Sequence, residues 1–161
     1  MNYQLAGPVL YLLDVVLPSV TPQTLRSNYS RTVPTLIAVL DALSLMSDNV
    51  SEGTAAIIRS ALGAVESLVL AQDFSSWKSD NERGVQAVFT TYLLGSGMDH
   101  RPKVRKRALE AIEKILTNPP AHPSATHPAA DDTAAICFHT VQAQFSQSKK
   151  NKNSTIQIGP V

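Results

Sequence analysis

The side chains best suited to binding a charged partner lie in one short segment of the sequence. Residues 99–117 carry a run of cations, with apolar residues at helical spacing between them. On a helical wheel at about 100° per residue, most of these cations fall on the face opposite Val104 and Ala108. Such a face is suited to bind phosphate groups or an acidic protein surface. The predicted partner-binding residues are Arg101, Lys103, Lys106, Arg107 and Lys114.

The same charges also have an ordinary explanation, which the sequence leaves open. Lys106 and Glu110, and likewise Glu110 and Lys114, are four residues apart, and such pairs occur on any solvated helix. The distribution of charge along the chain favours a binding role. Residues 1–100 carry five Lys and Arg against nine Asp and Glu, whereas residues 101–161 carry nine against four. This segregation indicates a partner with a phosphate backbone or an acidic surface near the C-terminal half.

Asp99 and Arg105 have a different predicted role. Pro102 suits the first turn of a helix, where its missing N–H would have no partner in any case. An Asp, a Val five residues later, an Arg next and an Ala three further on is the pattern of the second helix of a HEAT repeat. In such repeats the Asp and the Arg bond between neighbouring repeats. We therefore predict that Asp99 and Arg105 form a structural ladder.

Residues that could catalyse a reaction or bind a metal are present, but their spacing does not suit those tasks. Cys137 and His139 point in different directions on a predicted helix, and His122 and His127 lie in a proline-rich segment. No set supplies the three or four converging ligands that zinc needs. Neither a P-loop nor a Gly-x-Ser-x-Gly motif occurs. The sequence predicts no enzymatic activity, no cofactor and no small-molecule substrate. We expect the Cys137 thiol to be packed in the protein and the imidazoles to be solvated.

The elements that must position these residues are predicted to be helices in pairs. Apolar residues recur at intervals of three and four, and no alternating β pattern is present. The predicted pairs cover residues 5–17 with 22–29, 34–46 with 52–72, and 81–94 with 102–117. Second helices thus open near residues 22, 52 and 101, with Ser51 and Asp80 as N-caps. The prediction is an all-α fold, an α-solenoid of HEAT/armadillo-like antiparallel helix pairs.

The chain changes character after residue 117. Four prolines in residues 118–130 predict an exposed inter-repeat loop, and residues 131–146 predict a further helix. Residues 149–161 are polar and basic and predict a flexible tail, so the solenoid segment covers residues 1–148. Trp77 is predicted to pack between repeats. The apolar stretch at residues 5–17 is too short to span a membrane, and the predicted solenoid lacks polar caps, as a segment of a longer array would.

Several motifs resemble one known family. The octet at residues 101–108, followed by Leu-Thr-Asn-Pro-Pro at 116–120 and His-Pro-Ala at 127–129, resembles the ribosomal-RNA-processing protein 12 family. Residues 11–18 and 25–27 resemble an upstream segment of the same family. The similarity spans about residues 5–148.

The resemblance implies a large, karyopherin-like HEAT-repeat factor of ribosome assembly in the nucleolus and nucleus, which shuttles to the cytoplasm. It implies association with preribosomal RNA and ribosome assembly proteins, and a link to preribosome export and the Ran GTPase. Three functions stay open. The chain could be a binding module for RNA or assembly proteins, a transport-receptor-like module for a Ran-type GTPase or nucleoporins, or a structural spacer.

Overall fold

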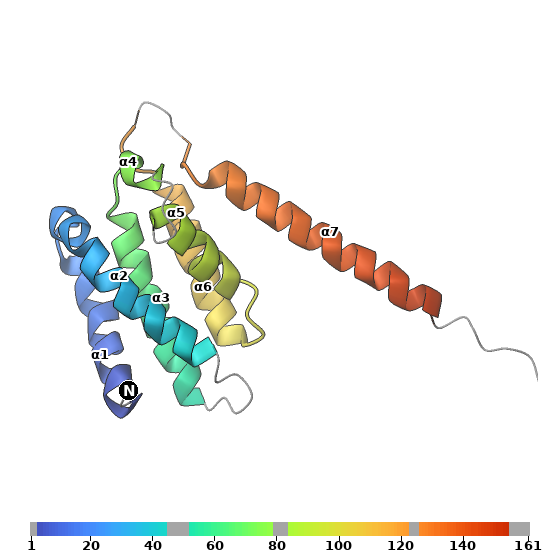
Figure 1. Cartoon of the computed structure of the whole chain (residues 1–161), viewed down its shortest axis with the longest axis horizontal. Coiled ribbons are helices and arrows are strands. Elements are labelled where there is room, and N and C mark those ends of the chain that lie inside the picture. Colours follow the sequence, from blue (N-terminus) through green and yellow to red (C-terminus); the bar gives the residue numbers. More distant parts are fainter. Residues whose placement is uncertain (1–2, 45–51, 79–83, 123–125, 155–161) are drawn as a thin grey trace, which may run out of the picture. The chain divides into compact units, whose positions relative to one another are not determined.

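The computed structural model describes residues 3–44, 52–78, 84–122 and 126–154, and these residues form helices and turns without a strand. The chain divides into two compact units, Met1–Pro128 and Ala129–Val161. In chain order the elements are α1 (Tyr3–Val16), the 3-10 turn η1 (Leu17–Ser19), α2 (Pro22–Ser44), α3 (Glu52–Leu70), α4 (Phe74–Trp77), α5 (Val85–Val88), the π-helical turn η3 (Phe89–Leu94), α6 (Pro102–Thr117) and α7 (Ala130–Ser154) (Figure 1). The predicted all-α fold is confirmed.

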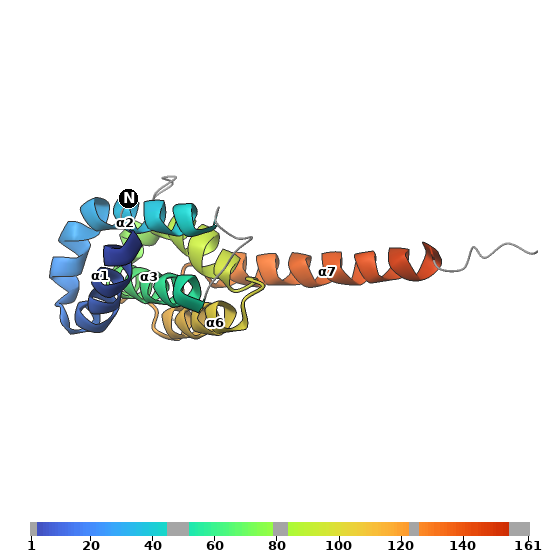
Figure 2. The same ribbon diagram turned by 90° about the horizontal axis from the view of Figure 1, so that it is seen from below.

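Helix α3 is the centre of the first unit and contacts α1, α2 and α6 (Figures 1 and 2). Its side chains are buried around most of its circumference, including Ala61, Leu62, Ala64, Val65, Leu68 and Val69. Within the described residues, Gly53–Leu70 is the one stretch long and apolar enough to span a membrane, but 61% of it is buried inside the protein. Its apolar character is therefore that of a core helix.

One pair of helix boundaries differs from the prediction. Helix α2 is continuous from Pro22 to Ser44, where the sequence predicted one helix ending at Tyr29 and another beginning at Pro34. Pro34 cannot donate a hydrogen bond to the carbonyl of the preceding turn, at a cost of about 3 kcal/mol. Burial of Val33, Leu36, Val39, Leu40 and Leu43 along α2 offsets that cost. Helix α2 is thus the first helix of the pair whose second helix is α3.

Helices α1 and α6 both pack against α3, and α5 with η3 packs next to α6. The predicted start of α6 at Pro102 is confirmed. Its buried face consists of Val104, Ala108, Ala111, Ile112 and Ile115, as the apolar spacing predicted. This packing orients α6, because its apolar stripe must face the core and its charged residues must then lie at the edges of that stripe or in solvent.

The proline-rich segment packs more closely than predicted. The His127 side chain is 5% exposed, and its ring meets Trp77 edge-on with centroids 4.5 Å apart. His122 stacks on Phe74 at 3.6 Å. Trp77 is buried and also contacts Phe89, which confirms its packing role. The prediction of an exposed loop with solvated imidazoles is therefore wrong at His127, because the apolar ring of Trp77 shields it from water.

The second unit contains α7, which begins at Ala130 and continues to Ser154. The helix includes residues 149–154 of the predicted tail, and residues 155–161 lie outside the described residues, as do the predicted caps Ser51 and Asp80. Cys137 is exposed on α7, so the prediction of a packed thiol is wrong.

The burial of His127 makes stability depend on pH. Burial lowers the pKa of His127 below its ordinary value of about 6.5, because the charged form loses its hydration. Below that pH the unfolded chain takes up a proton that the folded chain does not, so the stabilising contribution of neutral His127 is lost as the pH falls. His127→Phe should therefore show a smaller loss of unfolding free energy between pH 7.5 and 5.5 than the unaltered chain. Urea unfolding at both pH values measures this, and equal losses would contradict it.

Candidate partner-binding surface on helix α6

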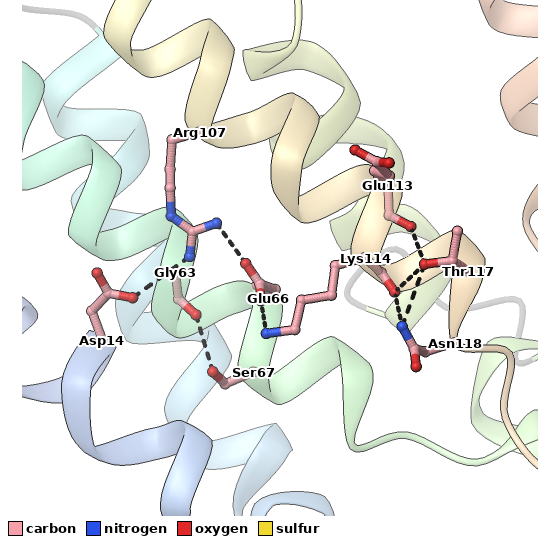
Figure 3. A network of polar contacts seen from close by, with 9 residues as sticks. All are labelled: Asp14, Gly63, Glu66, Ser67, Arg107, Glu113, Lys114, Thr117 and Asn118. Atoms are coloured by element: carbon pink, nitrogen blue, oxygen red, sulfur yellow. Dashed lines mark hydrogen bonds and ion pairs between the residues drawn. The ribbon is translucent and has the colours of Figure 1, made fainter.

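A buried carboxylate on α3 binds two of the predicted partner-binding residues. Glu66 is 4% exposed. Its Oε2 accepts a hydrogen bond from Nη1 of Arg107 at 2.5 Å, and its Oε1 accepts one from Nζ of Lys114 at 2.6 Å (Figure 3). A buried carboxylate is costly unless paired, so both α6 cations neutralise charge inside the protein.

Arg107 also reaches helix α1. Its Nη2 lies 3.6 Å from Oδ1 of Asp14 (Figure 3). Burial raises the pKa of Asp14 above its ordinary value, and the guanidinium of Arg107 opposes that rise. One α6 side chain thus links α6 to both α3 and α1.

The contact between Asp14 and Arg107 passes over Gly63 of α3 (Figure 3). A Cβ atom at residue 63 would overlap the Asp14 carboxylate and would lie 2.7 Å from Nη2 of Arg107. Glycine inside a helix costs about 1 kcal/mol relative to alanine. Its absent side chain provides the space in which the two charges meet.

Asp99 holds the start of α6. Its Oδ1 accepts hydrogen bonds from the backbone N–H and from Nε of Arg101, both at 2.8 Å, and its Oδ2 accepts one from Nη2 at 2.5 Å. These hydrogen bonds from Arg101 keep the pKa of Asp99 below its ordinary value. Arg105 donates from Nη1 to the main-chain carbonyl of Asp99 at 2.8 Å. Asp99 and Arg105 are thus in contact. The contact is made through the main-chain carbonyl of Asp99, and it lies within one loop and the helix that follows it.

The five predicted binding residues therefore separate into three sets. Arg101 is bonded to Asp99, and Arg107 and Lys114 are bonded to Glu66. Lys103 and Lys106 lie exposed on the surface of α6. The Lys106 side chain is 79% exposed, and its Nζ is 3.9 Å from Oε1 of Glu110, which is a loose pair of the predicted type. Lys114, by contrast, pairs with Glu66 in place of the predicted Glu110.

Sequence reasoning missed Glu66, although a signal was present. It is an acid in the interior of a long apolar helix, and the Ala, Leu and Val residues around it indicate that it is buried. Such a residue needs a cation from another element. The described part of the chain contains no group of three or more His, Cys, Asp or Glu side chains placed to bind a metal ion.

The paired, layered helices define the class of protein, a HEAT-repeat α-solenoid. The chain matches, over residues 1–157, the family described as RRP12-like, N-terminal HEAT repeats, and it belongs to that family. The resemblance found in the sequence is thereby confirmed.

Curated relatives agree with this assignment. The chain is 36% identical over 142 residues to ribosomal RNA-processing protein 12 of Saccharomyces cerevisiae, covering 84% of this chain and 10% of that protein. It is 30% identical over 151 residues to the putative ribosomal RNA-processing protein 12 of Schizosaccharomyces pombe (94% and 12%), and 28% identical over 159 residues to the human RRP12-like protein (93% and 11%). The chain thus spans about a tenth of the length of these relatives. No solved structure matches it.

The Glu66 pairing predicts strong coupling between two residues. Arg107→Met should lower the free energy of unfolding by about 1–3 kcal/mol, because the buried carboxylate loses one of its two cations. Adding Glu66→Gln to that variant should cost less than it does alone, because the charge that needed Arg107 is gone. Urea unfolding of the four chains gives the coupling energy, and additive effects would contradict it. Lys106→Met is the control and should cost less than about 0.5 kcal/mol.

The crossing at Gly63 predicts an unusual response to alanine. Gly95→Ala should raise the unfolding free energy by about 0.5–1 kcal/mol, because a Cβ there meets no atom within 4 Å. Gly63→Ala should give no such gain, because its Cβ displaces the Asp14 and Arg107 side chains. In an Asp14→Ala background part of the gain at residue 63 should return, because the atoms closest to that Cβ belong to Asp14. Thermal unfolding of these variants tests this, and a full gain in the unaltered background would disprove it.

Proposed function

We propose that this chain is a non-enzymatic module of a nucleolar or nuclear ribosome assembly factor, and that it contacts preribosomal RNA within small-subunit precursors. The family match over residues 1–157 supports this proposal, as do relatives named for ribosomal RNA processing. A stack of helix pairs presents an extended surface, which suits a scaffold. Ribosome assembly proteins are the expected neighbours in the same particle.

The proposed RNA contacts are Lys103 and Lys106. Both are exposed on α6, so their ammonium groups have access to phosphates. Arg101, Arg107 and Lys114 serve a different purpose, because Asp99 and Glu66 hold them and they fix the position of α6. The side chain of Lys114 is still 55% exposed and adds to the positive potential. Exposed Glu110 and Glu113 reduce that potential, so this helix provides one weak, salt-sensitive contact among many in a longer protein.

A transport-receptor role is the second candidate, with nucleoporin repeats or a Ran-type GTPase as partner and shuttling between nucleus and cytoplasm. One feature favours it. A shallow, mostly apolar groove of about 370 Å³ lies between α1 and α3, lined by Pro8, Tyr11 and Ile57 among others. Apolar peptide side chains suit such a groove. An apolar repeat peptide whose binding is lost with Tyr11→Ser would support this role.

The RNA proposal is tested with a ribosomal RNA fragment. In a fluorescence anisotropy titration at two ionic strengths, Lys103→Gln combined with Lys106→Gln should weaken binding. It should also reduce the slope of log affinity against log salt by about 1.4–1.8, from two lost phosphate contacts. Arg107 and Lys114 are left intact, because replacing them would leave the buried carboxylate of Glu66 without a cation.

The control carries the same loss of charge elsewhere. Arg31 and Lys78 are exposed cations on α2 and after α4, so Arg31→Gln with Lys78→Gln should leave the affinity nearly unchanged. An equal loss in both double variants would show a general effect of net charge, and no loss in either would return Lys103 and Lys106 to a solvated face.

A further inference from the structure

Arg59 of α3 is a half-buried arginine whose side chain has no partner. Among the described residues, that side chain forms neither a hydrogen bond nor an ion pair, and its Nε atom is buried without an acceptor. An unsatisfied buried donor is costly, and folded proteins keep few of them. Arg101 and Arg107 differ, because each of them binds a carboxylate. No bond within the described protein therefore explains the charge of Arg59.

The position of Arg59 on α3 places it beside the start of α6. Arg59 precedes Glu66 by seven residues, which is about two helical turns, so both project from the same side of α3. Glu66 identifies that side as the one toward α6, because it binds Arg107 and Lys114. The two helices run in the same direction, α3 from teal to green and α6 from yellow to orange (Figure 1). Since Gly63 lies next to the Arg107 side chain, Arg59, one turn earlier, is level with the first turn of α6.

The start of α6 brings cations to Arg59. The first turn of α6 carries no acidic residue, and Lys103 in that turn and Lys106 in the next are exposed. The one acid of α1, Asp14, is already in contact with Arg107. Neighbouring helices pack with their axes about 8–10 Å apart, so long side chains from α3 and α6 can reach the same anionic chain. The junction of the two helices therefore combines cations from both of them.

We propose that Arg59 is a third phosphate contact, which extends the RNA-binding surface from α6 onto α3. This inference rests on the proposed function, because it requires RNA to bind at Lys103 and Lys106. A guanidinium donates two parallel hydrogen bonds to a phosphate group, whereas an ammonium acts as a point charge. Turning Arg59 toward RNA breaks no bond within the described protein, and it releases the buried Nε atom from its unsatisfied position. Arg107, by contrast, would first have to leave Glu66.

Titration of the 161-residue chain with the ribosomal RNA fragment tests this contact. Arg59→Gln should weaken binding about 10-fold and reduce the slope of log affinity against log salt by about 0.7–0.9, because one phosphate contact is lost. Arg59→Lys keeps the charge but loses the planar fork, so it should retain the slope and lose part of the affinity. Arg31→Gln is the control, because it removes one charge from an exposed position on α2. Equal weakening by Arg59→Gln and Arg31→Gln would overturn the proposal.

The same titrations separate this inference from the proposed function. Lys103→Gln with Lys106→Gln should weaken binding whether or not Arg59 contacts RNA. If that double variant weakens binding and Arg59→Gln does not, the proposed function stands and the contact at Arg59 is wrong. If the unaltered chain does not bind the RNA fragment, both are wrong.

Thermal unfolding distinguishes an RNA contact from a residue that supports the fold. Arg59→Gln should leave the melting temperature unchanged or raise it, because no bond of the Arg59 side chain within the described protein is lost. Arg107→Met should lower the melting temperature, because Glu66 loses one of its cations. A decrease for Arg59→Gln as large as that for Arg107→Met would show that Arg59 supports the packing of α3 and α6, and it would overturn the proposal.

Discussion

The arrangement of the first unit depends on the burial of one carboxylate. Glu66 lies on the central helix, and its two oxygen atoms each accept a hydrogen bond from an α6 cation. Removing an ion from water costs several kcal/mol, so α6 must dock in a register that brings Arg107 and Lys114 to this point. Because Arg107 also contacts Asp14, the same requirement places α1. The apolar stripes supply most of the stability, whereas these charges select one alignment of the three helices.

The acidic and basic halves of the sequence pair in part with each other in the folded protein. The acidic excess of residues 1–100 includes Asp14, Glu66 and Asp99, and the basic excess of residues 101–161 includes the cations that bind them. Part of the segregation, three of nine acids and three of nine cations, is therefore resolved by internal pairing as the helices stack. Lys103 and Lys106 lie exposed on α6, and they are the two residues of that helix that we propose as RNA contacts. This is consistent with a long repeat protein, in which each pair of helices contributes a modest part of the total binding surface.

Small residues and prolines also serve the packing in ways that their local preferences oppose. Glycine disfavours a helix interior, yet Gly63 provides the space that the Asp14–Arg107 contact needs. Pro34 disfavours one too, yet α2 continues through it because its buried face packs against α3. In the segment after α6, His127 is held by Trp77 where the sequence alone indicated an exposed loop. At Gly63 and Pro34 a contact between distant elements outweighs a local cost of about 1–3 kcal/mol.

The sequence by itself determined the helical class, the family, and the core face of α6, because apolar periodicity and motif order are local properties. Pro102, Val104 and Ala108 lie where that periodicity predicted. Only the tertiary structure decided which cations pair with a buried carboxylate. A helical wheel gives the direction of each side chain, but it does not place Glu66, which lies 41 residues from Arg107 and 48 from Lys114. Long flexible cations at the edge of an apolar stripe turn toward a buried carboxylate or toward water, and the neighbouring helix determines which.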